Sequence, residues 1–266
     1  DLYLIKLLSI LFDVVLAWAA MRLAGMFTKS SGRRLFCFFA VLLWPTVVLN
    51  GAYWGQCDSI YSAFAVLSVY LALNKKPALS MLSIAASFAF KLQAVFLMPL
   101  FAILLFSRRM KLRHFFLFPA AYLALVLPAV LAGRPLWDTV TLYFSQMGSV
   151  GSGLNYNSPS VFAFFTGAVD TKLAATLGIA AAAGFTAFVI YWLHRNRNRV
   201  SDYTVFAVAV LFSVAIPFLL PHMHDRYFFI ADVLSLVFAV TMPEYFIMPL
   251  LCEFASLLGY HAYLKS

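Results

Sequence analysis

Four short polar clusters interrupt an otherwise apolar chain, and their residue types could bind a sugar and a phosphate. The clusters occupy residues 54–58, 90–93, 155–159 and 221–227. An ionisable residue beside a membrane-spanning stretch costs free energy, so it marks a candidate functional site. Because the charge pattern described below places all four clusters on one side of a membrane, we expect them to share one site.

The first cluster combines an aromatic ring with an amide and a carboxylate, in Trp54, Gln56 and Asp58. Amides and carboxylates bind neighbouring hydroxyls in pairs, and aromatic faces stack on the C–H surfaces of sugars. A turn anchored by Tyr53 and Trp54 at the membrane interface is the alternative. That alternative explains neither Gln56 nor Asp58, so we interpret the cluster as sugar- or acceptor-binding.

The second cluster places Lys91 and Gln93 inside a long apolar run. One alternative is that Lys91 extends its ammonium group to the interface, as membrane lysines do. The functional interpretation is a fixed cation for a phosphate at the membrane boundary.

The fourth cluster carries His222, His224, Asp225 and Arg226 within five residues at the start of an apolar run. Histidine and arginine donate hydrogen bonds to phosphate oxygens, arginine as a bidentate fork. The His/Asp/His pattern leaves a divalent metal open as an alternative. The predicted substrate-binding residues are Trp54, Gln56, Lys91, Gln93, Asn155, Asn157, His222, His224, Asp225, Arg226 and Tyr227.

Composition identifies the class of protein that carries these clusters. Apolar residues make up 64% of the 266 and charged residues 11%, where a soluble domain has roughly 25%. The sequence therefore predicts an integral, multi-pass membrane protein. The net charge of +9 comes from short loops between apolar runs, which argues against nucleic acid as a partner. Cys37, Cys57 and Cys252 have no metal-binding or disulfide spacing.

The apolar runs predict an all-α bundle of about nine membrane segments in one domain, residues 1–266. We expect Asp13 and Asp232, which lie within spans, to make contacts between helices. The expected segments are Leu2–Met26, Leu35–Asn50, Ser59–Leu73, Ala78–Phe106, Phe115–Ala132, Leu173–Leu193, Tyr203–Leu220, Tyr227–Thr241 and Tyr245–Leu264.

Lysine and arginine residues predict the orientation of these segments, since cytoplasmic loops carry an excess of both. The pattern assigns four loops to the cytoplasm and the four polar clusters to the external face. Twelve of the 19 basic residues fall in those loops: Lys29, Arg33, Arg34, Lys75, Lys76, Arg108, Arg109, Lys111, Arg113, Arg195, Arg197 and Arg199.

Two stretches depart from simple spans. Ala78–Phe106 is too long for one span and has basic loops at both ends, so we expect two short helices with a turn at Lys91. Residues 133–170 form an external loop, in which Trp137 and residues 142–144 predict an interfacial helix. The glycines between Gly148 and Gly153 predict a hinge that closes over the sugar.

Three motifs of the chain resemble those of the multi-span GT-C glycosyltransferases that use polyprenyl-phosphate sugars. They are Trp54-Gly55-Gln56-Cys57-Asp58, Phe90-Lys91-Leu92-Gln93 with Pro99, and His224-Asp225-Arg226-Tyr227. The similarity is greatest to bacterial relatives of the second mannosyltransferase of GPI-anchor synthesis and to the glucosyltransferases of lipid-linked oligosaccharide assembly. It runs from about Lys6 to the final helices.

The resemblance implies inverting transfer of a mannose- or glucose-class hexose from a polyprenyl- or dolichyl-phosphate carrier to a glycan or lipid acceptor. The transfer would occur at the external face of a bacterial cytoplasmic membrane rather than in the endoplasmic reticulum. Lys91, His224 and Arg226 would contact the phosphate, with no obligatory cofactor. The family places its acidic base in a first external loop, which we expect to precede Asp1 together with one span. Asp58 is then the fallback base.

A transporter or flippase for a lipid-linked saccharide is the alternative from another class. Such proteins show paired broken helices near the membrane midplane and repeated halves. The sequence has one candidate break and no evident repeat, and a scaffold subunit would not need the clustered lysine, histidine and arginine. We therefore expect a transferase.

Overall fold

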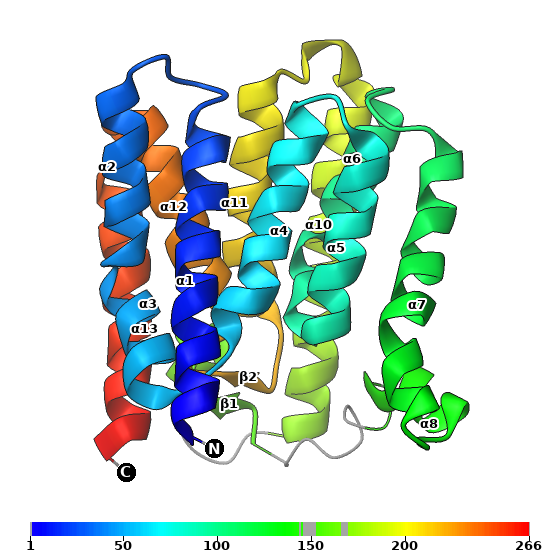
Figure 1. Ribbon diagram of the computed structural model, residues 1–266, viewed down its shortest axis with the longest axis vertical. Helices are drawn as coiled ribbons and strands as arrows, with labels where there is room; N and C mark the ends of the chain where they lie inside the picture. Colours follow the sequence, from blue (N-terminus) through cyan, green and yellow to red (C-terminus); the bar gives the residue numbers. More distant parts are fainter. Residues whose placement is uncertain (1, 144, 146–152, 166–169, 266) are drawn as a thin grey trace.

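A computed structural model of the chain describes residues 2–143, 145, 153–165 and 170–265. Its described part contains twelve α-helices that run mostly alongside one another, with loops gathered at two ends (Figure 1). Two strands of two residues each, β1 (Asn155–Tyr156) and β2 (Met223–His224), pair in parallel at one end. The structure confirms the expected all-α class of the fold.

Hydrophobic runs account for the long helices, and caps and prolines set several of their ends. Ser201 and Asp170, for example, accept backbone N–H groups at the starts of two helices. The α-helices are α1 (Leu2–Ala24), α2 (Ser31–Leu42), α3 (Pro45–Val48), α4 (Asp58–Leu73), α5 (Pro77–Phe90), α6 (Met98–Phe106), α7 (Leu117–Leu131), α8 (Leu136–Val140), α10 (Thr171–Arg195), α11 (Asp202–Leu219), α12 (Phe229–Thr241) and α13 (Ile247–Lys265).

Five helical segments of the described chain are long and apolar enough to cross a membrane, and a sixth is a bent pair. Shorter apolar helices lie at Asp58–Leu73, Pro77–Phe90, Leu92–Phe106 and Phe229–Thr241. Along α7 no described residue is buried, although the helix is almost wholly apolar. Such a surface fits lipid contact, and the chain has the features of a multi-pass membrane protein.

The second expected span, Leu35–Asn50, is not one straight helix. It consists of α2 and a segment Pro45–Trp54, bent by 44° at a break between them. Pro45 lacks an N–H for helix bonding, and Trp44 before it is extended, with φ −63° and ψ 130°. Leu49–Trp54 then forms a π-helical turn. The proline thus redirects the chain toward the first polar cluster.

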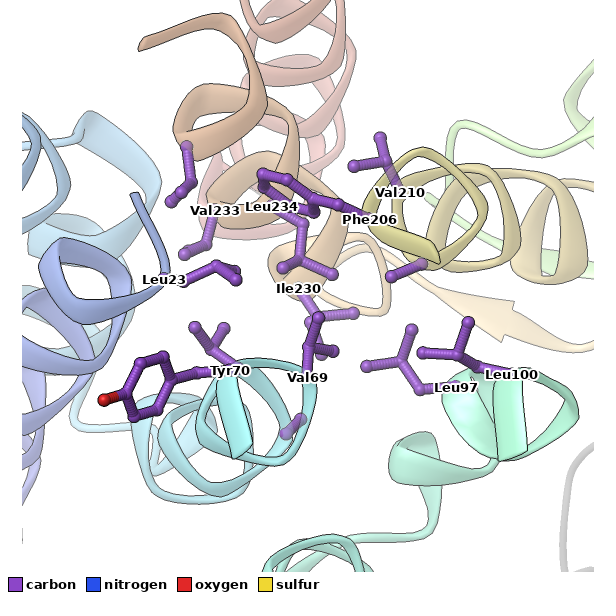
Figure 2. Close-up of a cluster of buried hydrophobic side chains, with 14 of the residues drawn as sticks. Leu23, Val69, Tyr70, Leu97, Leu100, Phe206, Val210, Ile230, Val233 and Leu234 are labelled. Atoms are coloured by element: carbon purple, nitrogen blue, oxygen red, sulfur yellow. The ribbon is translucent and has the colours of Figure 1, made fainter. Parts of the chain in front are cut away.

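The core is an apolar cluster between α1, α4, α6, α11 and α12. Figure 2 shows Leu23, Val69, Leu97, Phe206 and Ile230 converging from these and adjoining elements, and each is 1% exposed or less. Burial of such side chains supplies interior packing that lipid-facing residues cannot. The core therefore fixes how the helices that carry the polar clusters sit against each other.

Serines join α4 to α5 along the length of their contact. Ser80, Ser83 and Ser87 each donate a hydrogen bond of 2.7 Å to backbone carbonyls of α4, those of Ser68, Phe64 and Tyr61 respectively. Small polar residues allow close helix approach in membranes and hold helices together by hydrogen bonding. This ladder sets the position of Lys91, which follows α5 directly.

The expected break at Lys91 is confirmed. α5 ends at Phe90, Lys91 is extended with φ −157° and ψ 136°, and a 3₁₀ turn, Leu92–Leu97, leads into α6. The chain therefore turns at Lys91 and runs back alongside the bundle (Figure 1). The side chain of Lys91 lies at a helix end and not in the middle of a continuous span.

The basic loops lie at one end of the bundle and the polar clusters at the other (Figure 1). At the basic end, Arg109 forms an ion pair with Asp202 and donates to the carbonyl of Val200 at 2.9 Å. This contact brings two of the four basic loops together. The expected separation of the basic loops from the polar clusters is confirmed.

The connection of residues 133–170 is only partly helical. α8 ends at Val140, and Tyr143 donates to the carbonyls of Phe88 and Ala89 at 2.8 and 3.2 Å, so it packs against the end of α5. Trp137 is exposed, as expected for an interfacial residue. Phe144 and residues 148–152 of the expected hinge lie outside the described residues.

The two ends of the bundle should be accessible from opposite sides of the membrane. We expect Arg134→Cys and Lys172→Cys to react with a membrane-impermeant maleimide in intact spheroplasts. Lys75→Cys and Arg197→Cys should react only after permeabilisation, because the positive-inside pattern places their loops in the cytoplasm. The measurement is gel-shift labelling of each variant.

The labelling requires a background without Cys37, Cys57 and Cys252, and that background serves as the unlabelled control. Equal labelling of Arg134→Cys and Lys75→Cys in intact spheroplasts would contradict the orientation.

Candidate functional site

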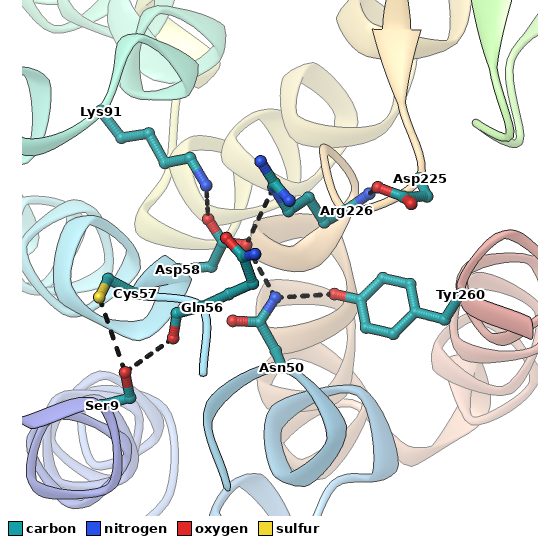
Figure 3. A network of polar contacts seen from close by, with 9 residues as sticks. All are labelled: Ser9, Asn50, Gln56, Cys57, Asp58, Lys91, Asp225, Arg226 and Tyr260. Carbon is teal, nitrogen blue, oxygen red and sulfur yellow. Dashed lines mark hydrogen bonds and ion pairs between the residues drawn. The ribbon is translucent and has the colours of Figure 1, made fainter. Parts of the chain in front are cut away.

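Asp58, the first residue of α4, is the centre of the candidate site. Its side chain is 1% exposed, yet it pairs with the ammonium of Lys91 and lies 3.9 Å from Nε of Arg226. Asn50 donates to its other carboxylate oxygen at 2.7 Å. Figure 3 shows these side chains converging from three separate segments. One buried carboxylate therefore holds two cations from clusters far apart in the sequence.

The π-helical turn before α4 positions the first cluster. Gly55 ends that turn at φ 81°, a left-handed conformation that glycine adopts without strain. Asn50 is fully buried there, and its amide also donates to the hydroxyl of Tyr260 at 3.1 Å. This hydrogen bond connects the site to α13.

Arg226 lies over the ring of Trp54, with its guanidinium carbon 5.4 Å from the ring centroid. Trp54 in turn packs edge-on against Tyr260. The Nε of Arg226 is buried without a hydrogen-bond partner among the described residues. The guanidinium is thus fixed in place by stacking and charge while part of its donor capacity is unused.

Lys91 and Gln93 lie next to each other at the helix break. The ammonium of Lys91 is 5.7 Å from the centroid of the Tyr61 ring, and its side chain is 24% exposed. Gln93 is 7% exposed and within hydrogen-bonding reach of Tyr227. Its Oε1 has no partner among the described residues. The second cluster therefore meets the fourth, as expected.

Backbone pairing joins the third cluster to the fourth. In the β1–β2 pair, Asn155 lies opposite Met223 and Tyr156 opposite His224. Asn157 forms a further bridge to His224, and His222 contacts the carbonyl of Gly153 at 2.7 Å through Nδ1. All four clusters therefore meet at one end of the bundle.

Asn155 and Asn157 shape the loop in addition to any binding role. Asn155 exchanges two hydrogen bonds of 2.9 Å with the backbone of Ser158, which closes a local turn. Asn157 and His222 have φ of 57° and 61°, in the left-handed region where non-glycine residues are uncommon. Such backbone conformations cost free energy and concentrate at functional sites.

His224 and Asp225 have environments that disfavour their charged forms. Burial, together with the nearby charges of Arg226 and Lys91, lowers the pKa of His224, whose ring stacks on Tyr156 at 4.7 Å. Burial raises the pKa of Asp225, although the guanidinium of Arg226 opposes this. Asp225 accepts the backbone N–H of Arg226 at 2.8 Å. The environment therefore disfavours the imidazolium form of His224 and the carboxylate form of Asp225 in the free protein.

Gln56 is held mainly through its backbone. Its carbonyl accepts from Ser9 at 2.7 Å and its N–H donates to the carbonyl of Asn50 at 2.9 Å. Its side chain is partly exposed at the end of the bundle. The structure places Gln56 beside Asp58 and assigns no protein partner to its amide among the described residues.

Asn50, Tyr156 and Tyr260 belong to the site but were not among the predicted site residues. Asn50 opens the polar stretch that continues to Asp58, which is a signal that sequence reasoning could have used. Tyr156 lies between two predicted residues. Tyr260 is on the last helix, and nothing in its sequence neighbourhood indicates the contact with Asn50.

Asp13 and Asp232 make contacts between helices, as expected. Asp13 on α1 accepts from Ser59 on α4, and Asp232 on α12 accepts from Ser256 on α13 at 2.9 Å. In a similar way, Glu253 accepts two hydrogen bonds of 2.8 Å from Thr46. Asp232 and Glu253 join helices in this way, and Asp13 does so beside the candidate site, next to Gly51 and Ser59.

The divalent-metal alternative receives no support from side-chain placement. Within the described part of the chain, no three histidine, cysteine, aspartate or glutamate side chains are grouped as metal ligands. The ring of His222 contacts the carbonyl of Gly153, and Asp225 accepts the backbone N–H of Arg226. The two cations of the site, Lys91 and Arg226, are both beside the Asp58 carboxylate.

Comparisons with protein families, curated proteins and solved structures found no match to this chain. The interpretation of the site therefore depends on its geometry.

Replacing Asp58 by Asn should destabilise the protein, because Lys91 and Arg226 would lose their shared counter-charge. Breaking a buried ion pair costs about 3–5 kcal/mol. The cations here are 24% and 27% exposed, so we expect a loss of roughly 2–3 kcal/mol, after discounting for solvent screening. Thermal unfolding in detergent micelles is the measurement.

Asp138→Asn is the matched control, since Asp138 is exposed at the same end of the bundle. The double variant Asp58→Asn/Lys91→Gln should recover part of the loss, because it removes one uncompensated cation. Unchanged stability in Asp58→Asn would show that the carboxylate does not hold the cluster together.

Proposed function

We propose that the chain transfers a hexose of the mannose or glucose class from a polyprenyl- or dolichyl-phosphate carrier to a glycan or glycolipid acceptor. The observation that carries this proposal is the pairing of two cations, Lys91 and Arg226, with one buried carboxylate. That trio has a net positive charge, and Arg226 has an unused buried donor. An anionic phosphate ester would complete it.

The membrane arrangement supports the same proposal. In this proposal the helices form about nine membrane segments of a GT-C-like bundle, with the short pair around Lys91 among them. Five of the described helices, or six with the bent pair, are long and apolar enough to cross a membrane. If the basic loops are cytoplasmic, the site lies at the external boundary, at the level of lipid headgroups. A carrier with a membrane-embedded chain would present its phosphate and sugar there.

In the proposed reaction the oxygen of an acceptor hydroxyl attacks the anomeric carbon of the hexose. The bond from that carbon to the phosphate oxygen breaks, and the phosphate leaves with the electron pair. A carboxylate takes the hydroxyl proton. Attack opposite the leaving group inverts the anomeric centre.

Lys91 and Arg226 stabilise the charge that develops on the leaving phosphate. Asp58 is a positioning residue for these cations, because its carboxylate is already engaged by Asn50 and Lys91. In this proposal Asp58 acts as a positioning residue in place of its expected role as the fallback base, and the base lies outside this cluster, as the resemblance implies.

The side chains around the cations suit a sugar. Gln56 and Gln93 offer amides near the two cations. Trp54 packs against Arg226, Tyr260 and Tyr263, so it holds the guanidinium in place beside them. Asn157 and His224 bridge each other where the third and fourth clusters pair. These groups are the proposed sugar and acceptor contacts.

A transporter or flippase for a lipid-linked saccharide is the second candidate. It is favoured by the two broken helical segments, at Trp44 and at Lys91, which both lead to the same site. Broken helices at a shared site are typical of transporters. Transfer and translocation are distinguished by whether the carrier loses its sugar.

Removing either phosphate-binding cation should reduce transfer. We expect Arg226→Ala and Lys91→Ala each to lower the rate from a polyprenyl-phosphate hexose by roughly 10²–10³, by analogy with loss of a preorganised oxyanion donor. The measurement is single-turnover transfer by the full-length protein in proteoliposomes.

Arg134→Ala and Lys172→Ala are matched controls, since each removes an exposed cation at the same end. Wild-type transfer by both site variants would refute the phosphate assignment. Sugar movement across the bilayer without cleavage from the carrier would favour the transporter.

Donor binding should strengthen as the pH falls below 7. The free-state pKa of His224 lies below its ordinary value of 6.5, and a bound anion would raise it. His224 therefore takes up a proton when the donor binds. Acidification favours the complex at pH values between the pKa of His224 in the free protein and its pKa in the complex. The donor is a phosphodiester, so its single negative charge does not change over this pH range. The measurement is equilibrium binding of the donor as a function of pH.

His224→Gln should abolish this pH dependence if His224 causes it. Asp225 has a raised pKa and would act in the same direction, since its protonation removes a competing negative charge. Asp225→Asn is therefore the comparison variant. A pH dependence that persists in His224→Gln but disappears in Asp225→Asn would assign the effect to Asp225.

A further inference from the structure

A second polar cavity lies at the end of the bundle that carries the basic loops, far from Asp58. Its volume is about 490 Å³, and it lies between the last turn of α1, the first turns of α2 and the end of α4. Two arginines, Arg22 and Arg34, line it together with the hydroxyl groups of Ser31 and Tyr70. None of these residues belongs to the four polar clusters.

Arg22 is held in a fixed position on the cavity wall. Its guanidinium donates to the hydroxyl of Tyr70 at 2.6 Å and lies over two rings, 5.3 Å from the centroid of Tyr70 and 5.9 Å from that of Trp18. Stacking leaves the other donors of the planar guanidinium free to face the cavity. The group is therefore preorganised for an oxyanion.

Arg34 approaches the same cavity from α2. Its guanidinium donates to Ser31 at 3.3 Å, which is a weak contact. A Cβ at Gly25 would lie 3.2 Å from Cδ of Arg34, so the missing side chain lets the arginine pass close over the end of α1. Two helices thus bring their cations to one cavity.

Neither guanidinium forms an ion pair with any described residue. Arg109, at the same end, pairs with Asp202. Two neighbouring guanidiniums without a counter-charge repel each other, and an anion between them removes that cost. The cavity therefore fits a phosphate group, to which arginine binds bidentately.

An apolar surface leads away from the cavity along both helices. Leu35, which lines it, is 54% exposed; one turn along α2, Phe39 is 50% exposed, and Trp18 on α1 is 42% exposed. These side chains face outward at membrane depth, where acyl chains would lie. This continuity selects a lipid over a free phosphate.

We propose that the cavity between α1 and α2 binds the headgroup phosphate of an anionic phospholipid, with its acyl chains along Trp18, Leu35 and Phe39. Basic pockets between membrane helices on the cytoplasmic side bind such headgroups. The site is independent of sugar transfer, because it lies at the opposite end of the bundle from Asp58.

The test is the count of bound phosphatidylglycerol by native mass spectrometry, with the full chain titrated in neutral detergent. We expect one tight site in the wild type, weakened roughly five- to ten-fold by Arg34→Gln and further in Arg22→Gln/Arg34→Gln. Arg33→Gln is the matched control, since Arg33 lines a different, apolar groove. It should bind like the wild type.

Three results would overturn the proposal: wild-type binding by both cavity variants, an equal loss in Arg33→Gln, or equal binding of zwitterionic phosphatidylcholine. Displacement of the lipid by an equal concentration of glycerol phosphate would assign the site to a soluble phosphate. If the double variant does not fold, Arg34→Gln decides, because the one hydrogen bond of the Arg34 side chain to a described residue is the weak contact with Ser31.

Discussion

The buried carboxylate of Asp58 is the constraint on which the arrangement of the site depends. A carboxylate that is 1% exposed must be compensated, and here the compensation comes from Lys91, Arg226 and Asn50. These partners belong to the break after α5, the segment before α12 and the turn before α4. Satisfying one charge therefore fixes three segments relative to each other. The cost of burial is what makes the arrangement specific.

Broken helices are the means by which a membrane bundle presents these groups. A continuous helix satisfies its own backbone and leaves only side chains to its surroundings. The proline after Trp44 and the extended residue Lys91 interrupt that regularity, and the first interruption redirects the chain toward Asn50 while the second carries Lys91 itself. Elsewhere the helices are joined by serine hydrogen bonds and apolar packing, which hold the two broken segments in fixed positions relative to each other.

Arginine is used at both ends of the bundle, with different partners. At the candidate site Arg226 stacks on Trp54 and is partly neutralised by Asp58. Partial neutralisation suits an anionic ligand that binds and is then released. At the basic end Arg22 stacks on Tyr70 and Trp18 without a carboxylate, which suits a resident anion. In these proposals the presence of a carboxylate at Arg226 and its absence at Arg22 distinguish the site of sugar transfer from the lipid-binding site.

The sequence alone determined the class of protein, most helices, the separation of basic loops from polar clusters and the break at Lys91. Each depends on local hydrophobicity, charge or the length of an apolar run. The sequence did not predict the bend at Pro45 within the second span, and it did not reveal that Asn50, Tyr156 and Tyr260 join the site. It named Asp58 as a candidate without its partners Lys91, Arg226 and Asn50. Only the tertiary structure decides such matters, because the role of a carboxylate depends on its neighbours. Those neighbours come from helices whose relative positions are set by packing over the whole bundle.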